Sequence, residues 1–286
     1  MDRNILLLLF IVLFPGFLIA QAVGEKRYSF QWLPKGHYFD PVYLDPTENQ
    51  IYGGLYLYWF NEEIQDKIYA SYSLGFQREI LRWEKDADHG FEFGIAATTF
   101  TQFEFLRPKD FFQSNLLNND FKVGGQFSYR EGEVSIRVRY WHVSAHLGDD
   151  FIFRYNVPGY YINPVIYEQA DILFSQEKGI FRFYGGLGIV THVTYERERA
   201  SVQLGFNFEK PFRNKNFRWI GGIDTRYLEE YSYRPNLNVV AGIEMGKPEN
   251  QPVRLILQYY NGHLPYSLYE FVTVQWLGLS MSFNAF

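Results

Sequence analysis

Residues 200–209 read ASVQLGFNFE, and this stretch decides the fold. Apolar side chains alternate there with small or polar ones, and a period of two is the pattern of a β-strand with two different faces. The same alternation recurs at residues 134–140, 237–245 and 277–283. Each segment is about ten residues long, the length that a tilted strand needs to cross a bilayer. The sequence therefore predicts an all-β chain of membrane-spanning strands.

About twelve such strands are predicted, and an even number of antiparallel strands closes into a single transmembrane β-barrel with both chain ends in the periplasm. The connections at 130–132, 176–179 and 246–251 are as short as periplasmic turns, whereas 106–120 and 145–163 are as long as outer loops. The connection at 77–90 is too long for a periplasmic turn, which puts the second strand in question. The predicted strands are 51–61, 68–76, 91–105, 121–130, 133–144, 164–175, 180–192, 198–209, 217–228, 236–246, 252–261 and 272–283.

Composition agrees with a barrel and excludes other classes. The chain of 286 residues is 47% hydrophobic and 20% aromatic, yet its mean hydropathy is -0.24. A polytopic helical membrane protein and a disordered chain are both excluded by this combination. The absence of Cys excludes a disulfide scaffold and a cysteine nucleophile. The net charge of -5 gives no basic footprint, so no nucleic acid is expected as a partner. The aromatic residues are expected in two interfacial girdles and on the outward strand faces.

The N-terminal residues predict secretion. Arg3 precedes an apolar run at 5–14, Pro15 breaks this run, and Ala20-Gln21-Ala22 fits a small-x-small cleavage site. We therefore expect a signal peptide at 1–22. The chain ends on Phe286, which resembles the signal that barrel-assembly machinery reads in its clients. Together these features predict the bacterial outer membrane as the location and its lipids as partners.

The segment between the signal peptide and the first strand reads differently. Residues 23–50 contain Pro34, Pro41 and Pro46, which cannot be ordinary members of a hydrogen-bonded ladder. This segment is expected to form a periplasmic arm or a plug at the barrel mouth, and residues 51–286 the barrel itself.

A candidate catalytic group lies at the outer end of the fifth predicted strand. His142 and Ser144 share the strand face assigned to lipid, so the imidazole could act as a general base on the hydroxyl. Asn156, Asp149 and Asp150 are the candidates for orienting the imidazole. The alternative is that these residues are ordinary rim residues, with Tyr140 and Trp141 in the aromatic girdle.

The spacing of His142, Ser144 and Asn156 resembles that of the outer membrane phospholipase A family, twelve-stranded barrels with His-x-Ser on an outward strand face and Asn twelve residues after the Ser. Lipid A deacylase barrels use a similar His-x-Ser. The resemblance implies lipid acyl hydrolysis with Ser144 as nucleophile and His142 as base. Where those families have Asn after the Ser, this chain has Ala145 and His146.

A second resemblance spans residues 33 to about 270 and implies an outer-membrane barrel without an established activity. The sequence resembles the bacterial domain-of-unknown-function family 1207 at 33–46, 115–121, 144–150 and 260–266. It also offers another reading of 144–150, as a family-typical loop of unknown role.

Two further groups of charged residues each allow two interpretations. Asp149 and Asp150 could bind Ca²⁺ through their carboxylates, or simply belong to a solvated loop. Charged side chains that parity points into the lumen could pair across it and close it, or line a narrow pore.

Three functions follow: a structural or narrow-pore barrel, a lipid acyl hydrolase, and a solute transporter. The expected lumen residues are Arg137, Arg139, Glu168, Gln203, Glu209, Asp224, Arg226, Glu244, Arg254 and Gln258.

Overall fold

The computed structural model describes residues 28–60, 63–106, 113–157, 165–213, 216–247 and 252–283. The expected signal peptide and Phe286 lie outside these ranges. Twelve long strands follow one another along the chain, each antiparallel to the next. They are β2 (Ile51–Phe60), β3 (Glu63–Asp86), β4 (His89–Leu106), β5 (Gln113–Glu131), β6 (Val134–Ser144), β7 (Ile166–Lys178), β8 (Phe181–Val193), β9 (Ala200–Pro211), β10 (Phe217–Leu228), β11 (Pro235–Met245), β12 (Val253–His263) and β13 (Thr273–Phe283).

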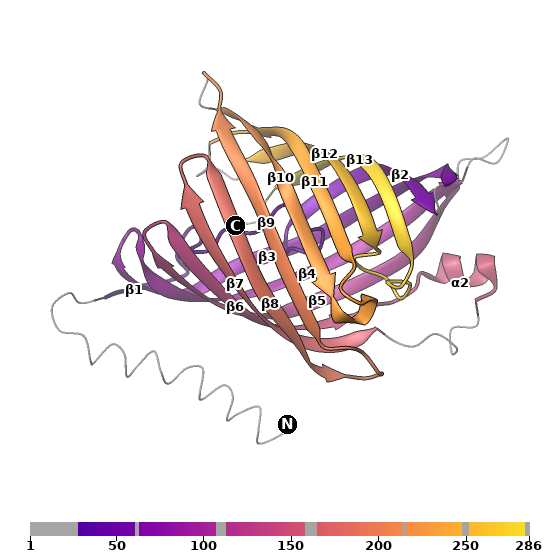
Figure 1. Cartoon of the computed structure of the whole chain (residues 1–286), viewed down its shortest axis with the longest axis horizontal. Helices are drawn as coiled ribbons and strands as arrows, with labels where there is room; N and C mark the ends of the chain where they lie inside the picture. The colour runs from indigo at the N-terminus through magenta and orange to yellow at the C-terminus, as the bar shows by residue number, and fades with distance from the viewer. Residues whose placement is uncertain are drawn as a thin grey trace.

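The sheet closes on itself. The last strand, β13, pairs with the first barrel strand, β2, in a register that sets Phe283 opposite Ile51. The predicted closed antiparallel barrel of about twelve strands is thus confirmed (Figure 1). A short additional strand, β1 (Ser29–Trp32), pairs with residues 81–84 of β3. Within the described ranges, no helix is long and apolar enough to cross a membrane.

The two ends of the barrel differ. At one end, two-residue turns at 87–88, 132–133 and 179–180 join β3 to β4, β5 to β6 and β7 to β8. We call this end of the barrel the turn end. The opposite loop end carries the helix α2 (Asp149–Tyr155) and the 3-10 turn η2 (Glu229–Tyr231). In Figure 1, β1 and α2 lie at opposite ends of the barrel.

Two predicted connections are corrected by the strand lengths. Residues 77–86 are not a loop, because β3 continues through them and pairs with β4 up to Asp86 opposite His89. Likewise, β5 begins at Gln113, so part of the expected loop 106–120 is strand. In both segments polar residues also occupy outward positions, such as Arg78 and Asn119, so the apolar alternation that marks the other strands is weak there.

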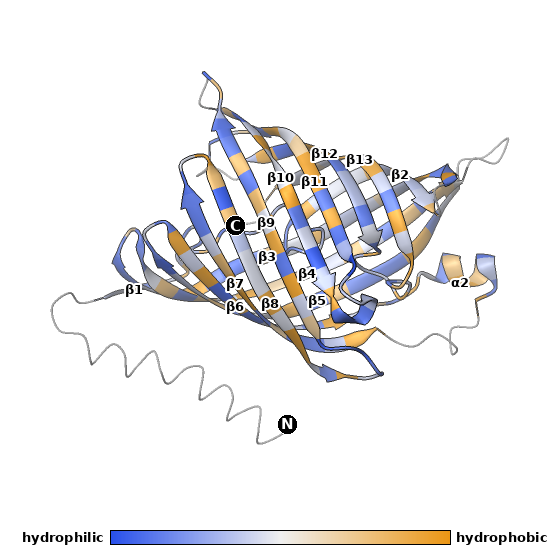
Figure 2. Ribbon diagram, viewed as in Figure 1, coloured by the Kyte–Doolittle hydropathy of each residue, from blue (hydrophilic) through white to orange (hydrophobic). Residues whose placement is uncertain are grey.

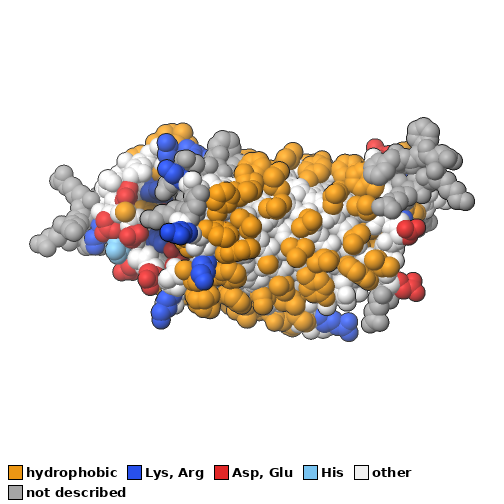
Figure 3. Space-filling view, turned by 90° about the horizontal axis from the view of Figure 1, so that it is seen from above, with side chains coloured by type: hydrophobic (Ala, Val, Ile, Leu, Met, Phe, Trp, Pro, Cys, Tyr) orange, Lys and Arg blue, Asp and Glu red, His pale blue; other side chains and the backbone are white. Residues whose placement is uncertain are grey.

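The outer face of the barrel is apolar. On β13, for example, Leu279 and Met281 are 61% and 53% exposed, whereas the intervening Ser280 is 6% exposed. Hydropathy alternates along the strands accordingly (Figure 2). Hydrophobic side chains form a broad band on the face seen in Figure 3, and charged side chains gather beyond it at both ends. This banding is the pattern expected of a barrel surrounded by lipid.

Residues 33–50, which we call the plug, run through the lumen. Four apolar plug residues pack against lumen-facing residues of β7, β8, β10, β11 and β12. Phe39 and Leu44 are almost completely buried there, at 0% and 1% exposure. A barrel of twelve strands is wider than one of eight, whose own side chains can fill the interior. The plug occupies that extra width. Its packed residues are Phe39, Val42, Tyr43 and Leu44.

Candidate functional site

The outer face of β6 carries the candidate hydroxyl and imidazole at the loop end. His142 and Ser144 are partly exposed, whereas Arg139 and Trp141, on the alternate face, are buried in the lumen. Trp141 is therefore not a girdle residue, as its place beside Tyr140 had suggested, because strand alternation turns it inward. Tyr140 is 48% exposed on the outer face.

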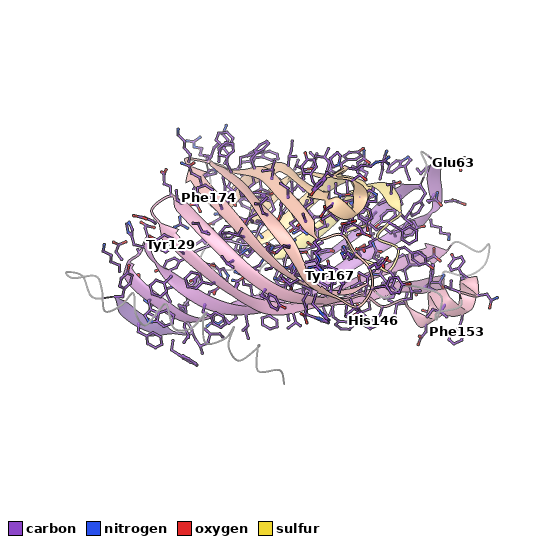
Figure 4. The ribbon with its side chains drawn as sticks, turned by 60° about the horizontal axis from the view of Figure 1, so that its bottom comes forward. Glu63, Tyr129, His146, Phe153, Tyr167 and Phe174 are labelled. Carbon is purple, nitrogen blue, oxygen red and sulfur yellow. The ribbon has the colours of Figure 1, made fainter. Side chains whose placement is uncertain are left out.

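The hydroxyl of Ser144 contacts a different imidazole from the one expected. Its Oγ lies 2.8 Å from Nε2 of His146, two residues further along the chain. A hydroxyl and an imidazole at this distance form a possible nucleophile–base pair. The Phe121 and His146 rings form a T-shaped pair, with the ring centroids 5.7 Å apart. His146 lies toward the same end of the barrel as Phe153 of α2 and away from Tyr129 (Figure 4).

The backbone after β6 holds His146 in this position. The N–H of Ala145 donates to the carbonyl of Val165, and the N–H of Asn119 donates to the carbonyl of His146. Leu147 then forms a bridge with Asn118 of β5. The chain is therefore held against the neighbouring strand β5 just beyond the end of β6. The pairing continues the register of β5 and β6, so the extended chain places the His146 ring on the same side as the Ser144 hydroxyl.

His142 has a carboxylate neighbour. Its Nδ1 lies 3.9 Å from Oε1 of Glu168, and the Tyr140 hydroxyl donates to the other carboxylate oxygen of Glu168 at 2.8 Å. Glu168 was expected in the lumen, and this expectation was wrong. It is the register partner of His142 and shares the outer face of β7 with Ile172 and Phe174. We call Tyr140, His142, Ser144, His146 and Glu168 the rim cluster.

Sequence reasoning missed two of these five roles. His146 was noted only as part of a loop, because the strand was expected to end at Ser144, although the pairing with β5 continues to Leu147 in the same register. Glu168 was assigned to the wrong face, although the parity of Ile172 and Phe174 gives the correct one. The other nine expected lumen residues do face the interior, either buried or partly buried there.

The expected orienting residues are not brought to the imidazoles. Asp149 and Asp150 form the first turn of α2, and Asp150 Oδ2 accepts a hydrogen bond from the Leu116 N–H. Acidic residues stabilise the N-terminal turn of a helix, which accounts for both. Asn156 ends α2 in a left-handed conformation with φ of 49°. In the described part of the chain, no hydrogen bond joins any of the three to His142 or Ser144.

The helix α2 is tied to a different part of the rim. The hydroxyl of Tyr155, next to Asn156, donates to Glu104 of β4 at 2.6 Å and accepts from Lys67 of β3 at 2.9 Å. β3 and β4 lie on the β5 side of β6, whereas Glu168 lies on the other side, on β7. In the ranges that the structure describes, no group of three or more His, Cys, Asp or Glu residues could hold a metal ion. Asp149 and Asp150 alone thus give a calcium ion few ligands.

The lumen contains a second cluster of charges, at the plug. Glu48, which is 0% exposed, accepts from Arg137 at 2.7 Å and from Arg139 at 3.0 Å. Burial alone would raise the pKa of Glu48, but the two guanidinium groups hold this pKa well below its usual value. Asp45 pairs with Arg226 at 2.6 Å. Ion pairs therefore attach the plug to two parts of the lumen wall, β6 and β10.

Comparison with known proteins agrees with this architecture. The model of a family described as a protein of unknown function, DUF1207, matches residues 20–285. The chain belongs to this family. The predicted resemblance is confirmed over nearly the whole chain. No curated protein matches the DUF1207 chain in sequence.

Solved structures similar to this DUF1207 member include outer membrane phospholipases. The Escherichia coli phospholipase A has 11% identity and a TM-score of 0.54, with 82% of this chain and 90% of that chain covered. The Salmonella typhi phospholipase, a dimer with bound calcium, has 13% identity and a TM-score of 0.55, with the same 82% and 90% coverage. At such identities the similarity shows an outer-membrane-type barrel fold.

Proposed function

We propose that this DUF1207 barrel lies in the bacterial outer membrane and hydrolyses acyl esters of lipids at its loop-end rim. The observation that carries the proposal is the 2.8 Å contact between Ser144 Oγ and His146 Nε2 on the outer face of the barrel. The same outer face of β6 carries exposed hydrophobic residues, Val138 and Tyr140, that lipid would cover. A nucleophile on the outside of a barrel can meet lipid substrates without any passage through the lumen.

The chemistry follows from this contact. Ser144 Oγ attacks the ester carbonyl carbon while its proton passes to Nε2 of His146. The protonated imidazole then returns this proton to the departing alcohol, which leaves the acyl group on Ser144. Water, deprotonated by the same imidazole, hydrolyses the acyl-serine and regenerates the hydroxyl. The proposed base is thus His146, while His142 with Glu168 forms an adjacent imidazole–carboxylate pair.

Lipid hydrolysis is tested with the purified barrel in detergent. We expect release of fatty acid from phospholipid or from lipopolysaccharide in mixed micelles, measured with and without added Ca²⁺. Ser144→Ala should lower the rate by at least about 10³-fold, since the nucleophile is lost. Ser114→Ala, at an exposed serine near the loop end of β5, is the matched control. An inactive wild type, or equal rates for wild type and Ser144→Ala, would exclude this function.

A second candidate function is a passage through the lumen controlled by the plug. The observation that favours it is that the plug is a separate segment inside the lumen, held there by side-chain contacts that include the ion pairs of Glu48 and Asp45. An open pore is disfavoured by the same plug. Conductance in planar bilayers distinguishes a closed barrel from an open one.

A further inference from the structure

A cavity of about 90 Å³ lies in the lumen between the plug and the loop end. Asp45 and Thr47 of the plug line one side, and Arg197 and Glu270 of two loop-end connections line another. Tyr167, which points from β7, also contributes (Figure 4). One buried water needs roughly 10–15 Å³. The cavity is therefore large enough for several waters or for one small solute.

Lys122 faces this cavity with an unusual set of contacts. The side chain is 3% exposed, and its Nζ donates to the carbonyl of Thr47 at 2.8 Å. The ammonium also lies 3.6 Å from the centroid of the Trp141 ring. An ammonium has three donors, and buried charges are normally paired. Across the described ranges, no carboxylate forms an ion pair with Lys122. By contrast, Lys67, whose side chain is partly exposed, pairs with Glu104 at 2.8 Å.

A second cation reaches the same turn of the plug. Arg226 donates from Nη2 to Asp45 and Gln203 at 2.6 and 3.3 Å. Its Nε and Nη1 groups have no hydrogen-bond partner among the residues that the structure describes. Thr47 donates to Asp45, so Lys122 and Arg226 are attached to one three-residue turn. Two cations with spare donors thus meet at the edge of the cavity.

Three of the acidic residues that line the cavity already contact donors of the protein. Asp224 accepts from Tyr184 and Gln203, both at 2.8 Å. Glu270 is paired with Arg197, and Asp120 accepts from Asn118 at 3.1 Å. Protein donors therefore already contact these three carboxylates, whereas no carboxylate of the described residues forms an ion pair with Lys122.

We propose that this cavity binds a small oxyanion, the carboxylate or phosphate group of a solute, between Lys122 and Arg226. Charge-assisted hydrogen bonds to an ammonium and a guanidinium are the usual means of recognising such groups. The anion would supply the partner that Lys122 lacks. The site is separate from the rim cluster, which lies on the outer face of β6, so binding here does not depend on lipid hydrolysis.

The test uses the full barrel in a zwitterionic detergent and measures its unfolding temperature. Inorganic phosphate and acetate are titrated separately, with sodium chloride at matched ionic strength as the reference. We expect a saturable rise in Tm of a few degrees with at least one of the two oxyanions, because a ligand that binds only the folded state stabilises it. A response to phosphate alone or to acetate alone identifies the group that the site recognises.

Variants separate this site from general salt effects. Lys122→Met should abolish the response, and Lys67→Met, at a lysine outside the cavity, should keep it. Arg226→Gln should weaken the apparent affinity by about tenfold or more, since one charge-assisted contact is lost. If neither oxyanion exceeds chloride in the wild type, the proposal is overturned. It is equally overturned if both Lys122→Met and Arg226→Gln fold and respond as the wild type does.

Discussion

Ser144 Oγ lies 2.8 Å from Nε2 of His146, whereas Nδ1 of His142, on the same strand face as Ser144, lies 3.9 Å from Glu168. The two imidazoles therefore have different neighbours, and only one of them contacts the hydroxyl. The His-x-Ser spacing in the sequence assigns the role of general base to His142, whereas the contact observed in the structure assigns it to His146. Mutation of each histidine in turn distinguishes the two assignments.

We expect His146→Ala to reduce acyl hydrolysis by about 10²–10⁴-fold, the range for loss of a general base. His142→Ala and Glu168→Gln should each have a smaller effect, and similar to one another, since they disrupt one pair. The measurement is kcat and KM on a phospholipid micelle substrate. His89→Ala, at an exposed histidine of the turn end bonded to Asp86, is the control. A loss that is greater for His142→Ala than for His146→Ala would return the role of base to His142.

The ion pairs of Glu48 give a prediction for stability. Glu48→Gln leaves Arg137 and Arg139 buried without their shared carboxylate, and breaking a buried pair in this way costs about 3–5 kcal/mol. Unfolding in urea should therefore shift to lower denaturant concentration. Glu63→Gln, at an exposed glutamate, should leave the transition unchanged. An unchanged midpoint for Glu48→Gln would mean that the ion pairs of Glu48 contribute little to stability.

The same carboxylate predicts how stability depends on pH. The pKa of Glu48 is depressed in the folded chain, so its contribution is fully present above the unfolded-state pKa of about 4.3. That contribution is lost as the pH falls through the lower folded-state pKa. The difference in unfolding free energy between wild type and Glu48→Gln should therefore stay constant from pH 7 to about 5 and shrink only in stronger acid. A difference that already disappears between pH 7 and 5 would contradict this assignment.

The strands could be predicted from sequence because each one alternates against two fixed environments, lipid and lumen. This signal located all twelve strands, including β9 and β13, whose outward residues are apolar over most of their length. It failed at residues 77–86, where β3 extends toward the turn end and contains Arg78, Glu79 and Arg82. Such a stretch reads as a loop, because the period-two pattern depends on one apolar face.

The plug and the rim cluster could be predicted only in part. Three prolines show that the plug is not a ladder strand, but its partners Arg137 and Arg226 lie 89 and 181 residues away from the acids that they bind. In the rim cluster, parity gives the outward direction of His142 and Ser144. The same parity would place His146 beside Ser144, but only if the strand pairing continues past Ser144 to Leu147, and the loop-like sequence after Ser144 does not reveal that continuation.

An ion pair joins two connections at the loop end. Arg197 pairs with Glu270, and the Arg197 guanidinium lies 4.3 Å from the centroid of the Tyr167 ring. We expect Arg197→Ala to release both connections and to increase amide hydrogen exchange at 195–199 and 266–271 without a change in the barrel strands. The reciprocal variant Glu270→Gln should have the same pattern. Exchange that rises in one connection only would show that the pair does not hold them together.

Conductance tests whether the plug closes the lumen. Twelve strands lie between the eight whose side chains fill a barrel and the sixteen or more that leave a water channel. We expect the wild type to be silent in planar bilayers because residues 33–50 occupy the space that the wall leaves open. Replacing residues 36–49 with a Gly/Ser linker of equal length removes Phe39, Leu44, Asp45 and Glu48 but keeps both attachments of the segment. This variant should show discrete conductance steps, and the double variant Asp45→Asn, Glu48→Gln should show brief ones. A folded linker variant that stays silent would show that lumen side chains, such as the stacked Tyr58 and Trp276, close the barrel without the plug.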